Sequence, residues 1–168
     1  MDLESIVLKY QKTKDDKYFN IIYSNTIKIV KFVLYTYTQD KNTIEDLSQD
    51  VYMKLVKVLD DYKENNIINY IYQIAKTTGI DYVRKVHELT NIDLTYIPSS
   101  SKNPYLNYAL SHLDNDLKEI FLMKVLLGYT TKKISLILNI SIKIVNSKYY
   151  KAKEMLAKEL EGIDDEIK

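Results

Sequence analysis

Side chains that could bind DNA recur along one face of the last predicted helix, residues 142 to 160. The opposite face is apolar at every third or fourth position, which predicts an amphipathic helix, with Val145, Tyr149, Ala152, Leu156 and Leu160. The polar face carries Lys143, Asn146, Ser147, Tyr150, Lys151 and Glu154, with Lys148 and Lys153 beside it. Lysine neutralises phosphates, while amides and hydroxyls bond to base edges in the major groove. We therefore expect Asn146 to read adenine and the lysines to hold phosphates; an ordinary solvated helix face is the alternative.

The residues before this helix complete a helix-turn-helix pattern. Thr130 is suited to cap a short helix over 132–138, and Ser141 is suited to cap the helix that follows. Asn139 tolerates the left-handed conformation of the turn, and Ile140 can fill the core between the two helices. A short helix, a three-residue turn and a longer helix together indicate a unit that binds double-stranded DNA.

Helical spacing predicts the elements that position these groups. Before the helix-turn-helix we expect a helix over 117–127, capped by Asp114 and ended by Gly128. Four helices are expected in the N-terminal part, over 3–11, 16–37, 43–62 and 66–85. The third of these has the most regular pattern, with Thr43 as its expected N-cap and an apolar stripe of Ile44, Leu47, Val51, Leu55, Val58 and Tyr62.

The fold class expected from these patterns is all-α, with two small helical domains joined by a flexible linker. The stretch from Asn91 to Pro104 is rich in serine and proline, which is typical of a linker. It separates a domain over 1–88 from a helix-turn-helix domain over 113–161, with residues 89–112 between them.

The composition excludes several kinds of site. Cysteine is absent, and the two histidines, His87 and His112, have no metal-ligand spacing. No glycine-rich phosphate loop or nucleophile motif occurs, so we expect no enzyme, no cofactor and no metal. No apolar run approaches the ~20 residues that cross a bilayer, and no signal peptide is evident, so we expect a cytoplasmic protein without membrane contact. The formal net charge is only +1, so DNA contact must depend on a local patch.

Two stretches resemble bacterial sigma factors of the extracytoplasmic-function type, in the sigma-70 family. Residues 128–134 and 140–152 resemble the fourth region of that family, which runs Gly-x-Ser/Thr, Ile-Ala, Gly-Ile-Ser, Val-Lys-Ser-Arg and Arg-Ala. Residues 45–52, Glu-Asp-Leu-Ser-Gln-Asp-Val-Tyr, resemble the Glu-Asp-Leu-x-Gln-Glu-x-Phe stretch of its second region, and residues 67–85 resemble the helix that opens the minus-ten element. Two motifs in the family's order are far more specific than either one.

The resemblance implies an alternative sigma factor, with core RNA polymerase and promoter DNA as partners and an anti-sigma factor as a further possible one. The polymerase would bind Glu45, Asp46, Gln49 and Asp50. The minus-ten single strand would contact Asn65, Asn66, Tyr70, Gln73, Lys76, Thr77, Arg84 and Lys85, with Tyr72 near the same face. The alternatives are a Tyr pair that faces the core and loop asparagines that are only solvated. The minus-thirty-five duplex would contact Thr131, Ser141, Lys143, Asn146, Ser147, Lys148, Tyr150 and Lys151.

The chain departs from the family's pattern at several of these positions. Tyr70 replaces a tryptophan and Gln73 a basic residue, while Asn146 stands where lysine is common. Lost positive charge weakens phosphate contact, so the promoter sequence does not follow from the resemblance. Two other functions stay open: a helix-turn-helix regulator that acts without core polymerase, and a helical protein-interaction module.

Overall fold

The structure, a computed structural model of the 168-residue chain, describes residues 2–63, 66–90 and 110–166, with side chains up to 88 and 159 in the last two of these ranges. All regular structure in these ranges is helical, which confirms the predicted fold class. The chain divides into two compact units, Met1–Pro98 and Ser99–Lys168. Most of the predicted linker, 89–112, lies outside the described residues.

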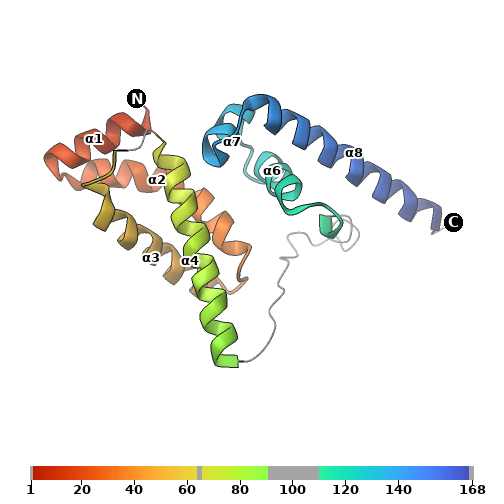
Figure 1. Cartoon of the computed structure of the whole chain (residues 1–168), viewed down its shortest axis with the longest axis horizontal. Coiled ribbons are helices and arrows are strands. Elements are labelled where there is room, and N and C mark those ends of the chain that lie inside the picture. Colours follow the sequence, from red (N-terminus) through yellow and green to blue (C-terminus); the bar gives the residue numbers. More distant parts are fainter. Residues whose placement is uncertain (1, 64–65, 91–109, 167–168) are drawn as a thin grey trace. The chain divides into compact units, whose positions relative to one another are not determined.

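The N-terminal unit is a bundle of α1 (Leu3–Thr13), α2 (Asp16–Tyr35), α3 (Lys41–Leu59) and α4 (Ile67–Thr90), drawn from red to green in Figure 1. Helix α2 contacts each of the other three helices. Its apolar face therefore supplies much of the core, where the fully buried side chains include Ile22, Ile29, Leu34, Leu55, Leu59, Ile67 and Ile71. Burying such side chains stabilises a helical unit far more than helix propensity does.

The ends of α3 differ from the prediction. Thr43 is not its N-cap: Asp40 is, and the Asp40 carboxylate accepts from the Thr43 backbone N–H at 2.7 Å. The first turn has no apolar residue, so spacing could not detect it. At the other end the buried residue is Leu59 and Val58 is 37% exposed, so the predicted stripe is wrong there. Tyr62 lies beyond the helix.

The C-terminal unit contains α6 (Asn115–Val125), α7 (Thr131–Leu138) and α8 (Ile142–Glu166). The expected turn is present: Thr130 accepts from the Lys133 N–H at 3.2 Å, and Asn139 is left-handed with φ of 54°. Gly128 has a positive φ, 64°, as expected, but α6 ends earlier than predicted, at Val125. Asp114 is the N-cap residue of α6, as predicted, although its side chain makes no capping hydrogen bond.

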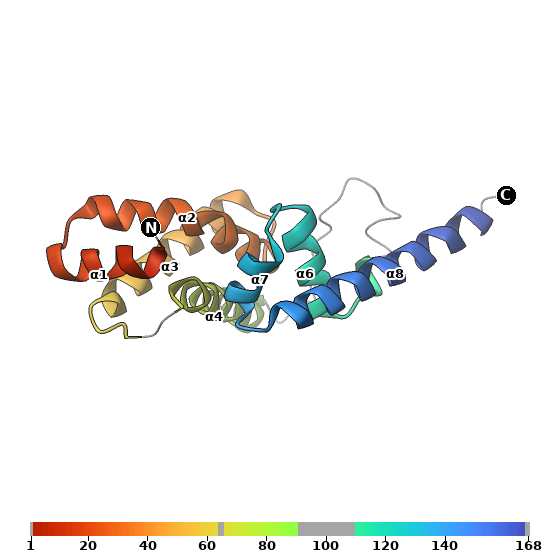
Figure 2. The ribbon, with the colours of Figure 1, turned by 90° about the horizontal axis from the view of Figure 1, so that it is seen from above.

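Helix α8 is longer than expected. Its predicted end near Leu160 is wrong, since the helix continues to Glu166, and its last turns extend beyond α6 and α7 in both views (Figures 1 and 2). The inner face is buried at Val145, Ala152 and Leu156, as expected, and half-buried at Tyr149, and α8 contacts both α6 and α7. The side chain of Leu160 lies outside the described residues. Ile140, the expected plug, is half-buried.

Within the described residues, no helix combines the length and apolarity that crossing a membrane requires.

Candidate nucleic-acid and polymerase interfaces

The outer face of α8 presents the predicted polar groups to solvent. The side chains of Lys143, Asn146, Ser147 and Lys151 are exposed, and Tyr150 is 66% exposed. Ser141 is also exposed, and its hydroxyl accepts from the Ile144 N–H at 3.3 Å, so it caps α8. The face therefore offers ammonium, amide and hydroxyl groups in one row, which is the chemistry that major-groove contact needs.

A chain of hydrogen bonds connects this face to α6 and α7. The Lys124 ammonium donates to the Thr131 hydroxyl at 2.8 Å, and Thr131 donates to Asn146 Oδ1 at 3.2 Å. Because an ammonium can only donate, the Thr131 hydrogen is left for Asn146. This fixes the amide with its oxygen toward α7. The second lone pair of Oδ1 and the amide N–H groups stay compatible with a bidentate contact to adenine.

Lys148 has a different environment from the other lysines of α8. It is half-buried and forms an ion pair with Asp116 of α6. The hydrogen bond from Lys148 lowers the pKa of Asp116 below its ordinary value. Sequence spacing did not reveal this partner, and Lys148 is therefore the least available of the predicted phosphate-binding lysines.

The predicted minus-ten residues of α4 form a stripe along one exposed side. Gln73, Thr77 and Arg84 are exposed and spaced by four and seven residues, so they share a face, which Ile80 extends at 45% exposure. Lys85 is exposed beside this stripe. A row of this kind combines amide, hydroxyl and cationic groups along about three helical turns.

The aromatic residues of α4 face less toward solvent than expected. Tyr72 is 2% exposed, so the expectation that its ring helps to form this face is wrong; Lys76 lies over that ring at 5.3 Å. Tyr70 is half-buried, with its ring centroid 5.3 Å from that of Tyr62. Asn66 caps α4, because its side-chain oxygen accepts from the Asn69 N–H at 3.1 Å. Asn65 lies outside the described residues.

The acidic end of α3 is exposed, as the predicted polymerase contact requires. Glu45, Asp46, Gln49 and Asp50 are all exposed, and Glu45 pairs with Lys31 of α2. The carboxylates project from the helix whose other side is packed in the core, so they could face a basic partner without disturbing the fold.

Comparison with known protein families identifies the family of the chain that carries these surfaces. The model of sigma-70 region 2 matches residues 22–88, and that of sigma-70 region 4 matches residues 105–156. Together they cover well over half of the chain, and region 2 precedes region 4. The chain belongs to the sigma-70 family. Helices α3 and α4 therefore lie in region 2, and the helix-turn-helix lies in region 4.

Relatives of this sigma factor are similar over most of their length. The ECF RNA polymerase sigma factor SigM of Bacillus subtilis (strain 168) is 27% identical over 158 residues, covering 86% of this chain and 97% of SigM. This agrees with the predicted extracytoplasmic-function type.

Two solved structures show the same fold. CnrH, in complex with the cytosolic domain of CnrY, has a TM-score of 0.63 at 16% identity and covers 96% of this chain and 99% of its own. The sigma factor RpoE in complex with the anti-sigma factor NepR, from Bartonella quintana, has a TM-score of 0.56 at 19% identity, over 85% of this chain and 96% of its own.

An apolar groove beside the acidic end of α3 was missed from the sequence. It encloses about 600 Å³ between α2 and α3, and Glu45 and Gln49 lie at its edge. Its lining includes Met53, which is 59% exposed, and the exposed Val56 and Tyr23. Met53 and Val56 are spaced by three residues, so the signal was a pair of apolar residues one turn apart, outside the predicted core stripe of α3. Of the acidic residues at this end of α3, Glu45 thus lines the groove.

No metal site accompanies these interfaces in the part of the chain that the structure describes, where no three His, Asp or Glu side chains gather as metal ligands would. His87 and His112 are both exposed.

Proposed function

We propose that this sigma factor directs core RNA polymerase to promoters through three surfaces on its two units. The acidic end of α3 and its apolar groove would bind the polymerase. The stripe of Gln73, Thr77 and Arg84 on α4 would bind the minus-ten strand, and the outer face of α8 would bind the minus-thirty-five duplex. The observation that carries the proposal is the ordered pair of region 2 and region 4 in one chain, each with an exposed polar face.

The chemistry of each surface supports its role. Exposed carboxylates on a helix that also lines an apolar groove suit a partner with basic and apolar side chains, because charge sets orientation and apolar burial supplies affinity. Amide and cationic groups along α4 suit a flexible single strand. The protein would contribute no catalytic group, since polymerisation belongs to the core enzyme, and its place of action would be the cytoplasm.

An anti-sigma factor is a further proposed partner. RpoE of Bartonella quintana was solved in complex with the anti-sigma factor NepR, and CnrH with the cytosolic domain of CnrY. By analogy, a protein that covers the apolar groove of α3 would compete with core polymerase.

Reconstituted transcription tests the proposal. Core polymerase with this protein should initiate at specific sites on genomic DNA, whereas core polymerase without it should not. The double variant Asp46→Asn and Asp50→Asn should bind core polymerase more weakly, while Asp16→Asn, an exposed acidic residue of α2, should not.

The two alternatives make different predictions. A regulator that acts without polymerase would bind as a dimer to a palindromic site with half-sites about one helical turn apart. An interaction module would show negligible DNA affinity at low salt. If the reconstituted enzyme gives no promoter-specific initiation, the sigma-factor proposal is wrong.

A further inference from the structure

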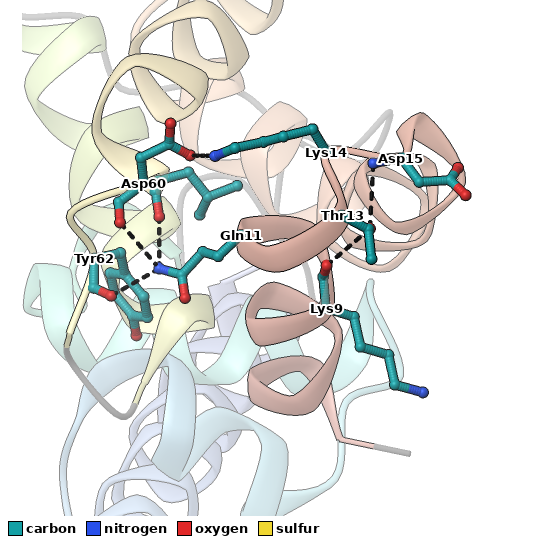
Figure 3. Close-up of polar contacts among 8 residues, drawn as sticks. Lys9, Gln11, Thr13, Lys14, Asp15, Asp60 and Tyr62 are labelled. Carbon is teal, nitrogen blue, oxygen red and sulfur yellow. Dashed lines mark hydrogen bonds and ion pairs between the residues drawn. The ribbon is translucent and has the colours of Figure 1, made fainter.

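Helix α1 lies before the region 2 match, which begins at residue 22, yet it contacts the ends of both helices around the α3–α4 connection. The Gln11 amide nitrogen donates to the carbonyl oxygens of Leu59 at 2.8 Å and Tyr62 at 2.9 Å, and more weakly to that of Asp60 at 3.5 Å. Figure 3 shows this amide directed at the end of α3. The last carbonyls of a helix have no partner within it, so Gln11 supplies a cap from a residue 48 positions away.

Glu4 does the same for the start of α4. Its carboxylate accepts from the backbone N–H of Ile67, the first residue of that helix. The Tyr62 hydroxyl hydrogen-bonds to the same carboxylate and accepts from the Asn66 N–H at 2.9 Å. One helix thus holds the end of α3 through Gln11 and the start of α4 through Glu4.

These contacts are better protected than the neighbouring ion pair. Glu4, Gln11 and Tyr62 are half-buried, whereas the Lys14–Asp60 pair has side chains that are 52% and 59% exposed. Exposed pairs contribute little to stability. The geometry of the connection therefore depends mainly on Gln11 and Glu4.

Asn66 and Tyr70 extend the proposed DNA-binding stripe of α4 to the start of the helix. Asn66, Tyr70, Gln73 and Thr77 are spaced by four, three and four residues, so they follow one side of the helix. Tyr70 packs on the ring of Tyr62. Gln11 donates to the Tyr62 carbonyl oxygen, and the Tyr62 hydroxyl hydrogen-bonds to Glu4. A shift of the connection would therefore move the first two residues of the stripe and leave the later ones in place.

We propose that Gln11 and Glu4 are positioning residues for recognition of the minus-ten strand, acting through Asn66 and Tyr70. The inference rests on the proposed function of α4 and names the device that pre-forms the site. If the connection is held correctly in only a tenth of the molecules of a variant, the apparent affinity for the strand falls about tenfold.

The first test measures the device itself, without DNA. In the full chain, Gln11→Leu and Glu4→Leu should accelerate hydrogen exchange at the amides of residues 66–70 by about tenfold, with exchange in the α2 core unchanged. Gln39→Leu, the same substitution at an exposed residue of the same unit, should leave these amides unaffected. Unchanged exchange at 66–70 in the α1 variants would overturn the proposal, whatever the protein's function.

The second test measures recognition. Holoenzyme is assembled from core polymerase and the full chain, and its affinity is measured for a non-template-strand oligonucleotide from a promoter that it transcribes, and for single-base variants of the minus-ten element. Gln11→Leu should lower both the affinity and the discrimination between bases. Gln11→Lys should restore them, because an ammonium can donate to the same three carbonyls.

The outcomes distinguish the positioning role of α1 from the proposed function of α4. Lower thermal stability with unchanged base discrimination would give α1 a purely structural role and overturn the positioning proposal. If hydrogen exchange is accelerated in the α1 variants but the wild-type holoenzyme binds all minus-ten variants equally well, the proposed function of α4 is wrong instead.

Discussion

Replacing Thr131 by valine should weaken base discrimination at the minus-thirty-five element without weakening DNA binding in general. Valine keeps the branched shape of threonine and removes the hydroxyl that joins Lys124 to Asn146. The Asn146 amide then loses the bond that orients it. Its carbonyl and amino groups can exchange places, so it presents the wrong edge to a base in part of the molecules.

The size of the effect follows from two limits. Free exchange of the two amide edges halves the population that reads correctly. Loss of the whole orienting hydrogen bond costs about 1 kcal/mol, which is about fivefold. We therefore expect discrimination to fall about two- to fivefold, against a total of about 1–3 kcal/mol for one bidentate base contact.

The assay is fluorescence anisotropy of holoenzyme on duplex promoters that carry single-base changes in the minus-thirty-five element. Asn146→Ala should abolish discrimination at one position, Thr131→Val should reduce it at that same position, and Thr131→Ser should preserve it. The reasoning is refuted if Thr131→Val discriminates like the wild type while Asn146→Ala does not, or if it weakens binding to all sequences alike.

Three further predictions concern the core, the phosphate contacts and pH. A Cβ on Gly79 would lie 2.7 Å from Cγ of the Tyr37 ring. Overpacking costs about 1–3 kcal/mol and outweighs a helix-propensity gain of about 1 kcal/mol, so Gly79→Ala should lower the free energy of unfolding measured in urea. The same substitution in a Tyr37→Ala background should cause no such loss. Lys151→Ala should weaken binding to matched and mismatched promoters equally and reduce the salt slope by about one, whereas an effect limited to matched promoters would contradict a phosphate role. Burial raises the pKa of Glu4, so its contribution to stability is complete below its ordinary value of 4.5 and is lost as pH rises through the raised value. Glu4→Gln, which keeps the acceptor for Ile67, should therefore gain melting temperature relative to wild type between pH 4 and pH 7, and a constant difference would contradict this.

Local signals in the sequence were enough for most of the fold. The buried face of α3 was predicted at Ile44, Leu47, Val51 and Leu55, because a helix packed on one side must repeat its apolar residues. The turn at Asn139 followed from the backbone tolerance of asparagine. The same spacing was wrong near the end of α3, where the packing against neighbouring helices selects Leu59 over Val58.

The connections between elements could not be predicted from the sequence. Gln11 caps a helix that ends 48 residues later, and Thr131 meets Asn146 across a turn of the chain. No periodicity encodes such pairs, since each partner is an ordinary polar residue on its own helix. Tyr72 shows the converse, because its residue type suggested stacking on a base while the bundle buries its ring.

These connections also limit how strongly the helix-turn-helix can bind DNA by charge. Lys148 is paired with Asp116, and Lys124 donates to Thr131, which leaves Lys143, Lys151 and the neighbouring Lys153 as the exposed lysines on or beside the predicted face. Three phosphate contacts would release few counterions and give a salt slope of only about −3, far shallower than that of a protein that binds duplex DNA through many phosphate contacts. Affinity for the promoter must then come from binding both promoter elements at once. Once one unit has bound its element, the other unit is held near its own element at a high effective concentration, and the overall affinity exceeds that of either unit alone. A sigma factor of this composition therefore depends on core polymerase to present its two units to the promoter together.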